Sequence, residues 1–391
     1  MSPKSIMELT KVVASRYLKA ISRKEKTKIL DEYCSNTGLN RKYAISKIRN
    51  FLFKNKKEKK KRGRKNSYSS LTDDILIKIW KIFDCICAER LHPYLGEAIR
   101  VLKKLGYLSI KPETEVELLR MSLSSVKRRI TKHRNLKQRT LISTTKPGYL
   151  LKKEIPIQTI SWDQNKPGFC EIDLVAHCGG SLIGDFIYTL QFVDLKTTWT
   201  ERKAVMGKSQ SRVFKGIKKV KKQLPFPLLG IDSDNGSEFI NWHLFNYCKE
   251  EKILFTRSRP YMKKDNAHIE QKNWTTVRKV LGYDRFDTEE HLRLINDLYD
   301  NELRLFINFF QPTMKLKKKT RIGSKYKREY DQAKTPYQRV LESKEISQEE
   351  KDKLISVYEK LDPVKLKKSI NRKINKIISL KKKTGKSQEN M

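Results

Sequence analysis

Apolar and polar residues alternate over residues 170–177, which is the pattern of a strand with one buried face. Glu171 and Asp173 lie on the polar face, opposite Cys170 and Ile172. The same reading predicts four more strands and a helix at 209–223; the strands are expected at 183–194, 198–206, 228–233 and 252–258. An antiparallel meander followed by alternating helix and strand predicts an α/β core with a mixed five-stranded sheet and flanking helices.

The first part of the chain predicts a helix, a turn at residues 37–39 and a second helix with Asn40 as its N-cap. The second helix carries basic residues at its start and flanks: Arg41, Lys42, Lys47 and Arg49. A recognition helix for the DNA major groove has this appearance. A small helical bundle with a solvated basic face explains the pattern equally well.

A second helical region follows at about residues 70–133 and ends in another predicted helix-turn-helix. Ser124 is the expected N-cap of its last helix. That helix presents a basic outward face, formed by Lys127, Arg128 and Arg129. Two such modules in one chain favour a protein that binds an extended DNA sequence.

Composition shifts divide the chain into six predicted segments. They are a helix-turn-helix module at 1–52, a basic linker at 53–69, a second helical DNA-binding module at 70–134, a connector at 135–167, the α/β core at 168–311 and a basic, mostly helical C-terminal region at 312–391. The last region opens with a basic stretch in which Lys317, Lys318, Lys319 and Arg321 are expected to contact phosphates, although a solvated loop is the alternative.

Net charge narrows the choice of partner. The 391 residues contain 86 Lys and Arg against 44 Asp and Glu, a formal charge of +42. Lys and Arg that neutralise phosphates release counterions and strengthen binding, so this surplus indicates a nucleic acid partner.

Cysteine usage and hydropathy give the expected compartment. The six cysteines show no CxxC spacing, and no histidine pair supports a zinc site. No apolar run approaches a membrane span or a signal peptide. We therefore expect a soluble, cytoplasmic, nucleoid-associated protein with reduced thiols and no membrane partner.

Three acids lie at positions typical of functional residues in an α/β sheet. The apolar run 228–233 ends at Asp234, followed by Asn235-Gly236 and then by a helix expected from Ser237. Glu270 lies on a later helix, in line with Trp274 and other apolar residues, so it is expected to face inward. Buried acids are uncommon without compensation, and Asp173, Asp234 and Glu270 therefore predict a shared cationic partner.

This arrangement resembles the DDE transposase and integrase superfamily, whose catalytic core is ribonuclease H-like. Thirty-five residues separate Asp234 from Glu270, as in the retroviral integrase pattern. The segments DSDNGSEF from Asp232 and NFFQP from Asn308 look like bacterial insertion-sequence transposases. The chain departs from retroviral integrases in lacking an amino-terminal His/Cys zinc module.

The resemblance implies an enzyme that cleaves DNA at element ends and joins the new 3′-hydroxyl to target DNA. Two carboxylates about 4 Å apart repel by roughly 4 kcal/mol at an effective dielectric near 20. Two Mg²⁺ or Mn²⁺ ions held by Asp173, Asp234 and Glu270 relieve this repulsion and suit displacement at phosphorus. Joining two ends implies a homo-oligomer in a synaptic complex.

Other polar residues compete for roles in this site. The rival acids are Glu171, Asp232 and Asp265, and the resemblance selects against them. Asn266 is expected to cap the helix of Glu270, and His268 is expected to be a surface or packed residue. Lys272 and Arg278 on the same helix either hold the DNA end or form an ordinary basic face.

Two alternatives to an active transposase remain open from the sequence. One is a catalytically silent DNA-binding regulator derived from a transposase, and the other is a plain ribonuclease H-type nuclease. An intact triad argues against the first, and two helical modules argue against the second. The sequence contains no phosphate-binding GxxxxGK[ST] loop and no HExxH helix.

Overall fold

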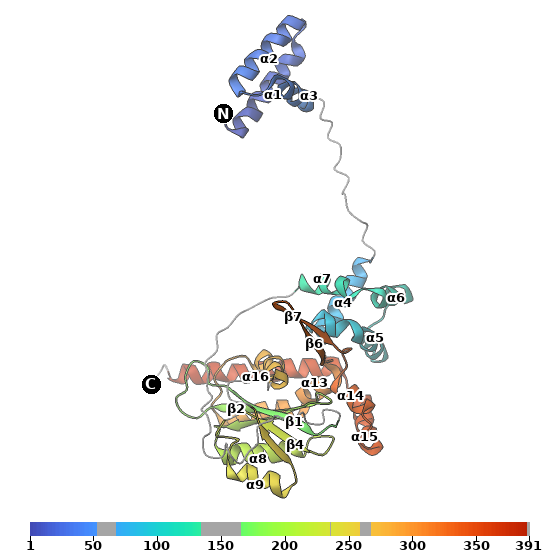
Figure 1. Ribbon diagram of the computed structural model, residues 1–391, viewed down its shortest axis with the longest axis vertical. Coiled ribbons are helices and arrows are strands. Elements are labelled where there is room, and N and C mark those ends of the chain that lie inside the picture. The colour runs from blue at the N-terminus through green and yellow to red at the C-terminus, as the bar shows by residue number, and fades with distance from the viewer. Residues whose placement is uncertain (53–67, 134–165, 235, 259–266, 389–391) are drawn as a thin grey trace. The chain divides into compact units, whose positions relative to one another are not determined.

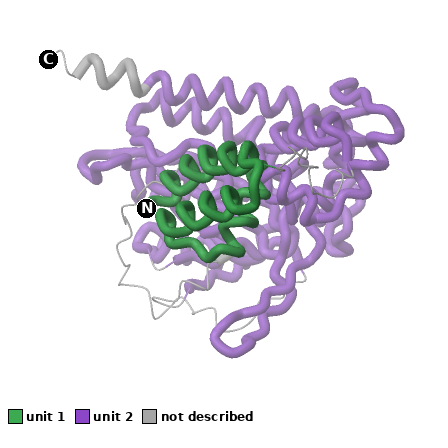
Figure 2. The backbone as a smooth tube through the Cα atoms, turned by 90° about the horizontal axis from the view of Figure 1, so that it is seen from above, with its two compact units in different colours: residues 1–67 green, residues 68–391 purple. Residues whose placement is uncertain are grey.

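A computed structural model describes residues 1–52, 68–133, 166–234, 236–258 and 267–388. The chain forms two compact units, residues 1–67 and residues 68–391 (Figure 2). The predicted basic linker and connector lie largely outside the described residues. No helix among the described segments has the length and apolar character needed to cross a membrane.

The first unit is a bundle of three helices: α1 (Pro3–Lys19), α2 (Arg23–Thr37) and α3 (Arg41–Leu52). Gly38 ends α2 in the left-handed region at φ 69°, which a glycine adopts without a Cβ penalty. The Asn40 side chain accepts a hydrogen bond from the backbone N–H of Lys42 at 3.0 Å. Tyr33, Ala44 and Ile48 are buried in the bundle core. The two helices and the turn predicted for this part of the chain are thus present. Helix α1 was not predicted from the sequence.

The second unit begins with four helices: α4 (Ser70–Ile82), α5 (Ala88–Lys104), α6 (Pro112–Arg120) and α7 (Leu123–Thr131). The N-cap of α7 is Ser122, whose hydroxyl accepts from the N–H of Ser125, so the prediction of Ser124 as cap is wrong. The helix begins earlier because Ser122 is the residue with extended backbone. Trp80, Leu91 and other apolar residues of these helices share one hydrophobic core with helices later in the chain.

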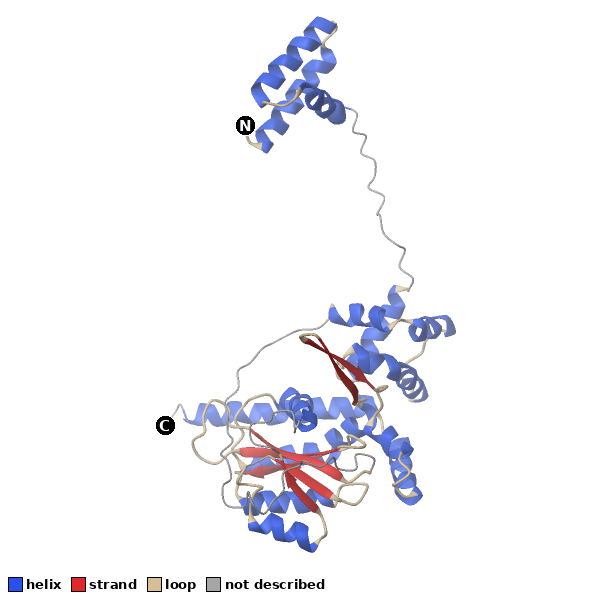
Figure 3. Ribbon diagram, in the orientation of Figure 1, coloured by secondary structure: helices blue, strands red, loops and turns tan. Residues whose placement is uncertain are grey.

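The mixed five-stranded sheet expected from the sequence is confirmed (Figure 3). Its strands are β1 (Phe169–Ala176), β2 (Ile187–Asp194), β3 (Thr200–Met206), β4 (Gly230–Ser233) and β5 (Leu254–Arg257). The spatial order is β3-β2-β1-β4-β5, with β1, β2 and β3 antiparallel and β4 and β5 parallel to β1. An antiparallel meander followed by two strands parallel to β1 agrees with the mixed sheet predicted from the sequence.

Helices cover both faces of the sheet (Figure 1). On one face α8 (Gln210–Lys221) and α9 (Trp242–Glu250) bury the apolar side of β1, including Cys170 and Ile172. On the other face lie α10 (Ala267–Lys272), the π-helix η1 (Asn273–Arg278), α11 (Lys279–Leu281), α12 (Glu289–Leu298), the π-helix η2 (Tyr299–Leu303) and α13 (Arg304–Phe310).

The helix after β4 starts later than expected. It begins at Trp242 with Asn241 as N-cap, whose side chain accepts from the N–H of Leu244 at 2.9 Å. Residues 237–241 form a turn instead, although Phe239 within it is fully buried. The helix does not begin at Ser237, because Asn241 has the extended backbone and the side-chain acceptor that an N-cap requires.

The C-terminal region contains a β-hairpin that the sequence reading missed. Strands β6 (Leu316–Ile322) and β7 (Lys325–Tyr330) pair antiparallel around Gly323, whose φ is +58°. Three helices follow: α14 (Pro336–Glu342), α15 (Gln348–Glu359) and α16 (Pro363–Gln388). Because β6 and β7 are exposed throughout, they lack the buried apolar face by which strands are recognised in a sequence.

Candidate active site

Asp173 on β1 and Asp234 directly after β4 are the next residues beyond the last pair of the ladder between these neighbouring strands. The parallel ladder between β1 and β4 pairs Glu171 with Asp232 and Ile172 with Ser233, so the next residues are Asp173 and Asp234. Adjacent strands lie about 4.8 Å apart. The sheet therefore brings these two acids together at the carboxyl end of β4.

The Asp173 carboxylate is held by two donors. Its Oδ1 accepts from the N–H of Leu174 at 2.8 Å, and its Oδ2 accepts from the Nδ2 of Asn273 at 2.5 Å. Burial, followed by the negative charge of Asp234, raises the pKa of Asp173 to about 7. Such a carboxyl gains most from a neighbouring cation, because a positive charge favours the ionised form.

Asp234 closes the turn after β4. Its Oδ1 accepts from the N–H of Gly236 at 3.0 Å, which is the local side-chain bond by which aspartate stabilises a turn. Burial raises the pKa of Asp234, while the hydrogen bond from Gly236 and the charge of Lys208 act in the opposite direction. The half-buried carboxylate remains partly open to solvent.

Glu171 has a role that the sequence reading missed. It is 3% exposed, and its Oε2 accepts from the N–H of Ile269 at 2.9 Å, in the first turn of α10. Burial raises its pKa to about 8, with further contributions from Asp232, Asp173 and Glu270. Glu171 thus fixes the start of α10 on the sheet and positions the helix that carries Glu270. The signal in the sequence that could have indicated this role was an acidic residue inside a predicted strand.

Glu270 is exposed, so the prediction that it faces inward is wrong. Val277 and Leu281 are buried as expected, but Trp274 is 57% exposed. The π-helical turn from Asn273 to Arg278 explains the difference, because its extra residue per turn rotates the helix face before it relative to the face after it. The expected single stripe is therefore divided into an exposed part and a buried part.

The Glu270 charge nevertheless belongs to the acidic cluster, since it contributes to the raised pKa of Glu171. Within the described segments, no three His, Cys, Asp or Glu side chains are placed to hold one metal ion. Asp265 and Asn266, expected near this helix, lie outside the described residues, as does the His268 side chain.

Two further acids near the site have structural partners. Asp232 is fully buried and accepts from the Oγ1 of Thr256 at 2.6 Å. Glu238 is buried and lies 3.8 Å from the Nζ of Lys208. The negative charge of Glu238 contributes to the raised pKa of Asp173, and that of Asp232 contributes to the raised pKa of Glu171.

The basic residues expected to contact DNA differ in exposure. In α3, Arg41, Lys42 and Arg49 are exposed and Lys47 is half-buried, with Arg41 paired to Asp31. Lys127 and Arg128 of α7 are exposed, and Lys127 pairs with Glu89 at 2.8 Å. Arg129 is half-buried, paired with Asp73 and stacked on the Tyr68 ring.

The remaining candidates lie in the core and in the hairpin. Lys272 is only 8% exposed and therefore does not form part of a basic surface. Arg278 is half-buried over the Tyr283 ring, and burial lowers its pKa. The four β6 cations, Lys317, Lys318, Lys319 and Arg321, are all exposed.

The chain is similar to a protein of Sinorhizobium fredii in sequence and to integrase catalytic cores in structure. No protein-family model matches the chain. Among solved structures, the catalytic core of BIV integrase is 18% identical with a TM-score of 0.31, covering 45% of this chain and 95% of that one. The magnesium-bound HTLV-2 integrase core is 14% identical with a TM-score of 0.29, covering 38% and 90%. The uncharacterized protein y4rM of Sinorhizobium fredii is 32% identical over 324 residues, 83% of this chain and 91% of that protein. The chain belongs to the family of y4rM.

Proposed function

We propose that this protein is a DDE-type transposase of an insertion sequence, which cleaves DNA at element ends and joins them to target DNA. The observation that carries the proposal is that Asp173 on β1 and Asp234, the residue directly after β4, follow the last pair of the parallel β1–β4 ladder. Burial raises the pKa of both carboxyls, and the charge of Asp234 adds to the shift of Asp173, so the fold carries an electrostatic cost. Such an arrangement is typical of a site that binds cations.

The donor set suits Mg²⁺ or Mn²⁺. Asp173, Asp234 and Glu270 offer carboxylate oxygens, which these cations prefer. When bound, two divalent cations supply charge neutralisation and activation of the attacking oxygen. The exposed position of Glu270, one turn into α10, leaves its carboxylate free to approach the two aspartates.

The reaction consists of two displacements at phosphorus. In the first, a water oxygen forms a bond to phosphorus and the 3′-oxygen of the element end leaves as a hydroxyl. In the second, this 3′-hydroxyl attacks a target phosphodiester and displaces its 3′-oxygen. The chain's contribution is to orient the groups: Asn273 holds Asp173, and Glu171 anchors α10.

DNA binding is assigned to the basic elements outside the sheet. The exposed cations of α3 and α7 suit the major groove and its phosphates, and the β6 cations suit the backbone of either end or target DNA. Because two element ends must be joined together, the active species is proposed to be a homo-oligomer.

The test is cleavage and joining of labelled DNA that carries the sequences flanking the gene, with Mg²⁺ and with Mn²⁺. Wild type should nick and join these ends, while Asp234→Ala and Glu270→Gln should bind the DNA and do neither. If the variants cut as well as wild type, the assigned site is wrong. If wild type binds the ends tightly but never cuts them, the protein is a DNA-binding regulator and not a transposase.

A further inference from the structure

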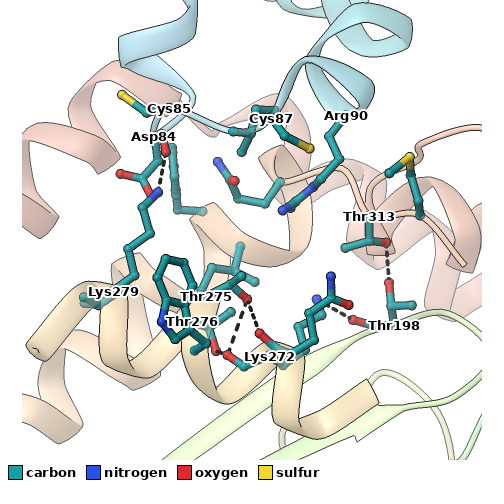
Figure 4. A pocket seen from close by; sticks show the side chains of 18 of the residues that line it. Asp84, Cys85, Cys87, Arg90, Thr198, Lys272, Thr275, Thr276, Lys279 and Thr313 are labelled. Carbon is teal, nitrogen blue, oxygen red and sulfur yellow. Dashed lines mark hydrogen bonds and ion pairs between the residues drawn. The ribbon is translucent and has the colours of Figure 1, made fainter. Parts of the chain in front are cut away.

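A cavity of about 1350 Å³ lies within the second unit, between α5, the helix α10–η1 and the segment before β6 (Figure 4). Arg90 extends into it from α5, while Lys272 forms the opposite wall. Thr198 and Thr313 line one side and are hydrogen-bonded to each other at 2.7 Å. Trp274 also lines the cavity and is 57% exposed, so it stands at the mouth.

Lys272 is the observation that indicates a ligand. Its side chain is more than nine-tenths buried, and its ammonium donates to the carbonyl of Thr198 at 3.4 Å. No carboxylate pairs with it among the residues that the structure describes. A buried cation without an anion is costly, so an anionic ligand would stabilise it.

The acids in the cavity lining are already neutralised. The pairs are Asp84 with Lys279 at 2.6 Å and Lys367 at 2.5 Å, Glu89 with Lys127 at 2.8 Å, and Asp331 with Arg339 at 2.7 Å. Arg90 donates its Nε to the carbonyl of Pro312 and has no carboxylate partner in the described segments. Lys272 and Arg90 thus leave the cavity with an uncompensated positive charge.

Two neighbouring features strengthen this reading. Arg202 is 1% exposed, lies over the Tyr299 ring at 5.7 Å, and has three guanidinium nitrogens without a hydrogen-bond partner in the described part of the chain. Thr198 adopts a positive φ of 60°, a conformation that residues other than glycine adopt where the surrounding structure imposes it, often at binding sites.

We propose that this cavity binds a phosphate group of a nucleic-acid strand, with Lys272 and Arg90 donating to the phosphate oxygens and Trp274 stacking on the attached base. Charge-assisted hydrogen bonds to phosphate and base stacking on an aromatic ring are the two usual components of single-strand binding. The identity of the strand rests on the proposed function. Lys272 lies two residues after Glu270 on the same helix, α10.

The test is calorimetric titration of the full-length protein with a 5′-phosphorylated dinucleotide, in EDTA and about 0.3 M salt to suppress surface binding. Inorganic pyrophosphate and an unphosphorylated nucleoside are the comparison probes. Lys272→Met should weaken dinucleotide binding by about tenfold or more, and Trp274→Ala by about fivefold. Lys249→Met, an exposed lysine of α9, is the matched control and should stay within about twofold of wild type.

Removal of an uncompensated buried charge should also raise the melting temperature of ligand-free Lys272→Met while abolishing its shift with dinucleotide. If Lys272→Met does not fold, Lys272→Gln is tested in its place. The proposal is overturned if a folded Lys272 variant binds the dinucleotide within twofold of wild type. It is also overturned if pyrophosphate binds as tightly as the dinucleotide and Trp274→Ala does not change the affinity. Since the assay involves no cleavage, inactive protein that still binds the dinucleotide through Lys272 rejects the proposed function alone.

Discussion

The buried Glu171 carboxyl makes the stability of the metal-free protein depend on pH. Its pKa is raised from 4.5 to about 8, chiefly by burial. The native state therefore holds this proton more tightly than the unfolded state does. The resulting stability is fully present below the unfolded pKa of 4.5 and is lost as the pH rises through about 8.

The size of the effect follows from the shift. A difference between 4.5 and about 8 corresponds to about 5 kcal/mol when the loss is complete. Between about pH 5 and about pH 8.5, wild type should lose about 4 kcal/mol of unfolding free energy through this group. Glu171→Gln retains an oxygen that can accept from Ile269 but has no proton to lose, so its stability should not fall in this way.

The assay is denaturant unfolding of wild type and Glu171→Gln in EDTA at both pH values. Glu250→Gln is the matched control, because Glu250 is exposed on α9 of the same core, and this variant should follow wild type. If Glu171→Gln loses as much stability as wild type between the two pH values, Glu171 is not a protonated buried carboxyl and the electrostatic account of the cluster is refuted.

Replacing the four β6 cations with glutamine should weaken DNA binding. It should also reduce the slope of log affinity against log salt concentration by up to about 3 to 4. An unchanged slope would show that the hairpin does not contact the DNA backbone. Gly168→Ala should lower the unfolding free energy by more than about 1 kcal/mol, because at φ +106° its Cβ would lie 2.3 Å from the Pro227 carbonyl oxygen. Phe239→Ala should cost about 3 to 5 kcal/mol, since that ring is fully buried, and a loss below about 1 kcal/mol would show that the turn does not pack as described. Denaturant titration measures both of these losses.

The sheet was predictable because its strands differ from their surroundings in apolar content. Ile172, Ile231 and Phe255 fall in runs bounded by turn residues, and each is buried in one core. The sequence predicted a shared partner for Asp173 and Asp234, and the pairing of β1 with β4 accounts for their closeness.

Features that depend on tertiary contacts were not predictable. The π-helical turn after Lys272 has no signature in residue spacing, so Glu270 was placed on the wrong face. Lys272 is buried where α10 packs on β1 and β2, and its ammonium donates to the carbonyl of Thr198, 74 residues away in the sequence. The bond from Ile269 to Glu171 spans 98 residues and likewise follows from the packing of α10 on β1.

The central claim is that Asp173 and Asp234 form a divalent cation site, and Mn²⁺ binding measured by electron paramagnetic resonance tests it most directly. Wild type should bind Mn²⁺ more tightly as the pH rises through about 7, because protonation of Asp173 competes with the cation. Asp173→Asn and Asp234→Asn should each weaken binding by about tenfold or more, while Glu250→Gln should bind as wild type does. Equal Mn²⁺ affinity in wild type and both aspartate variants would contradict the claim.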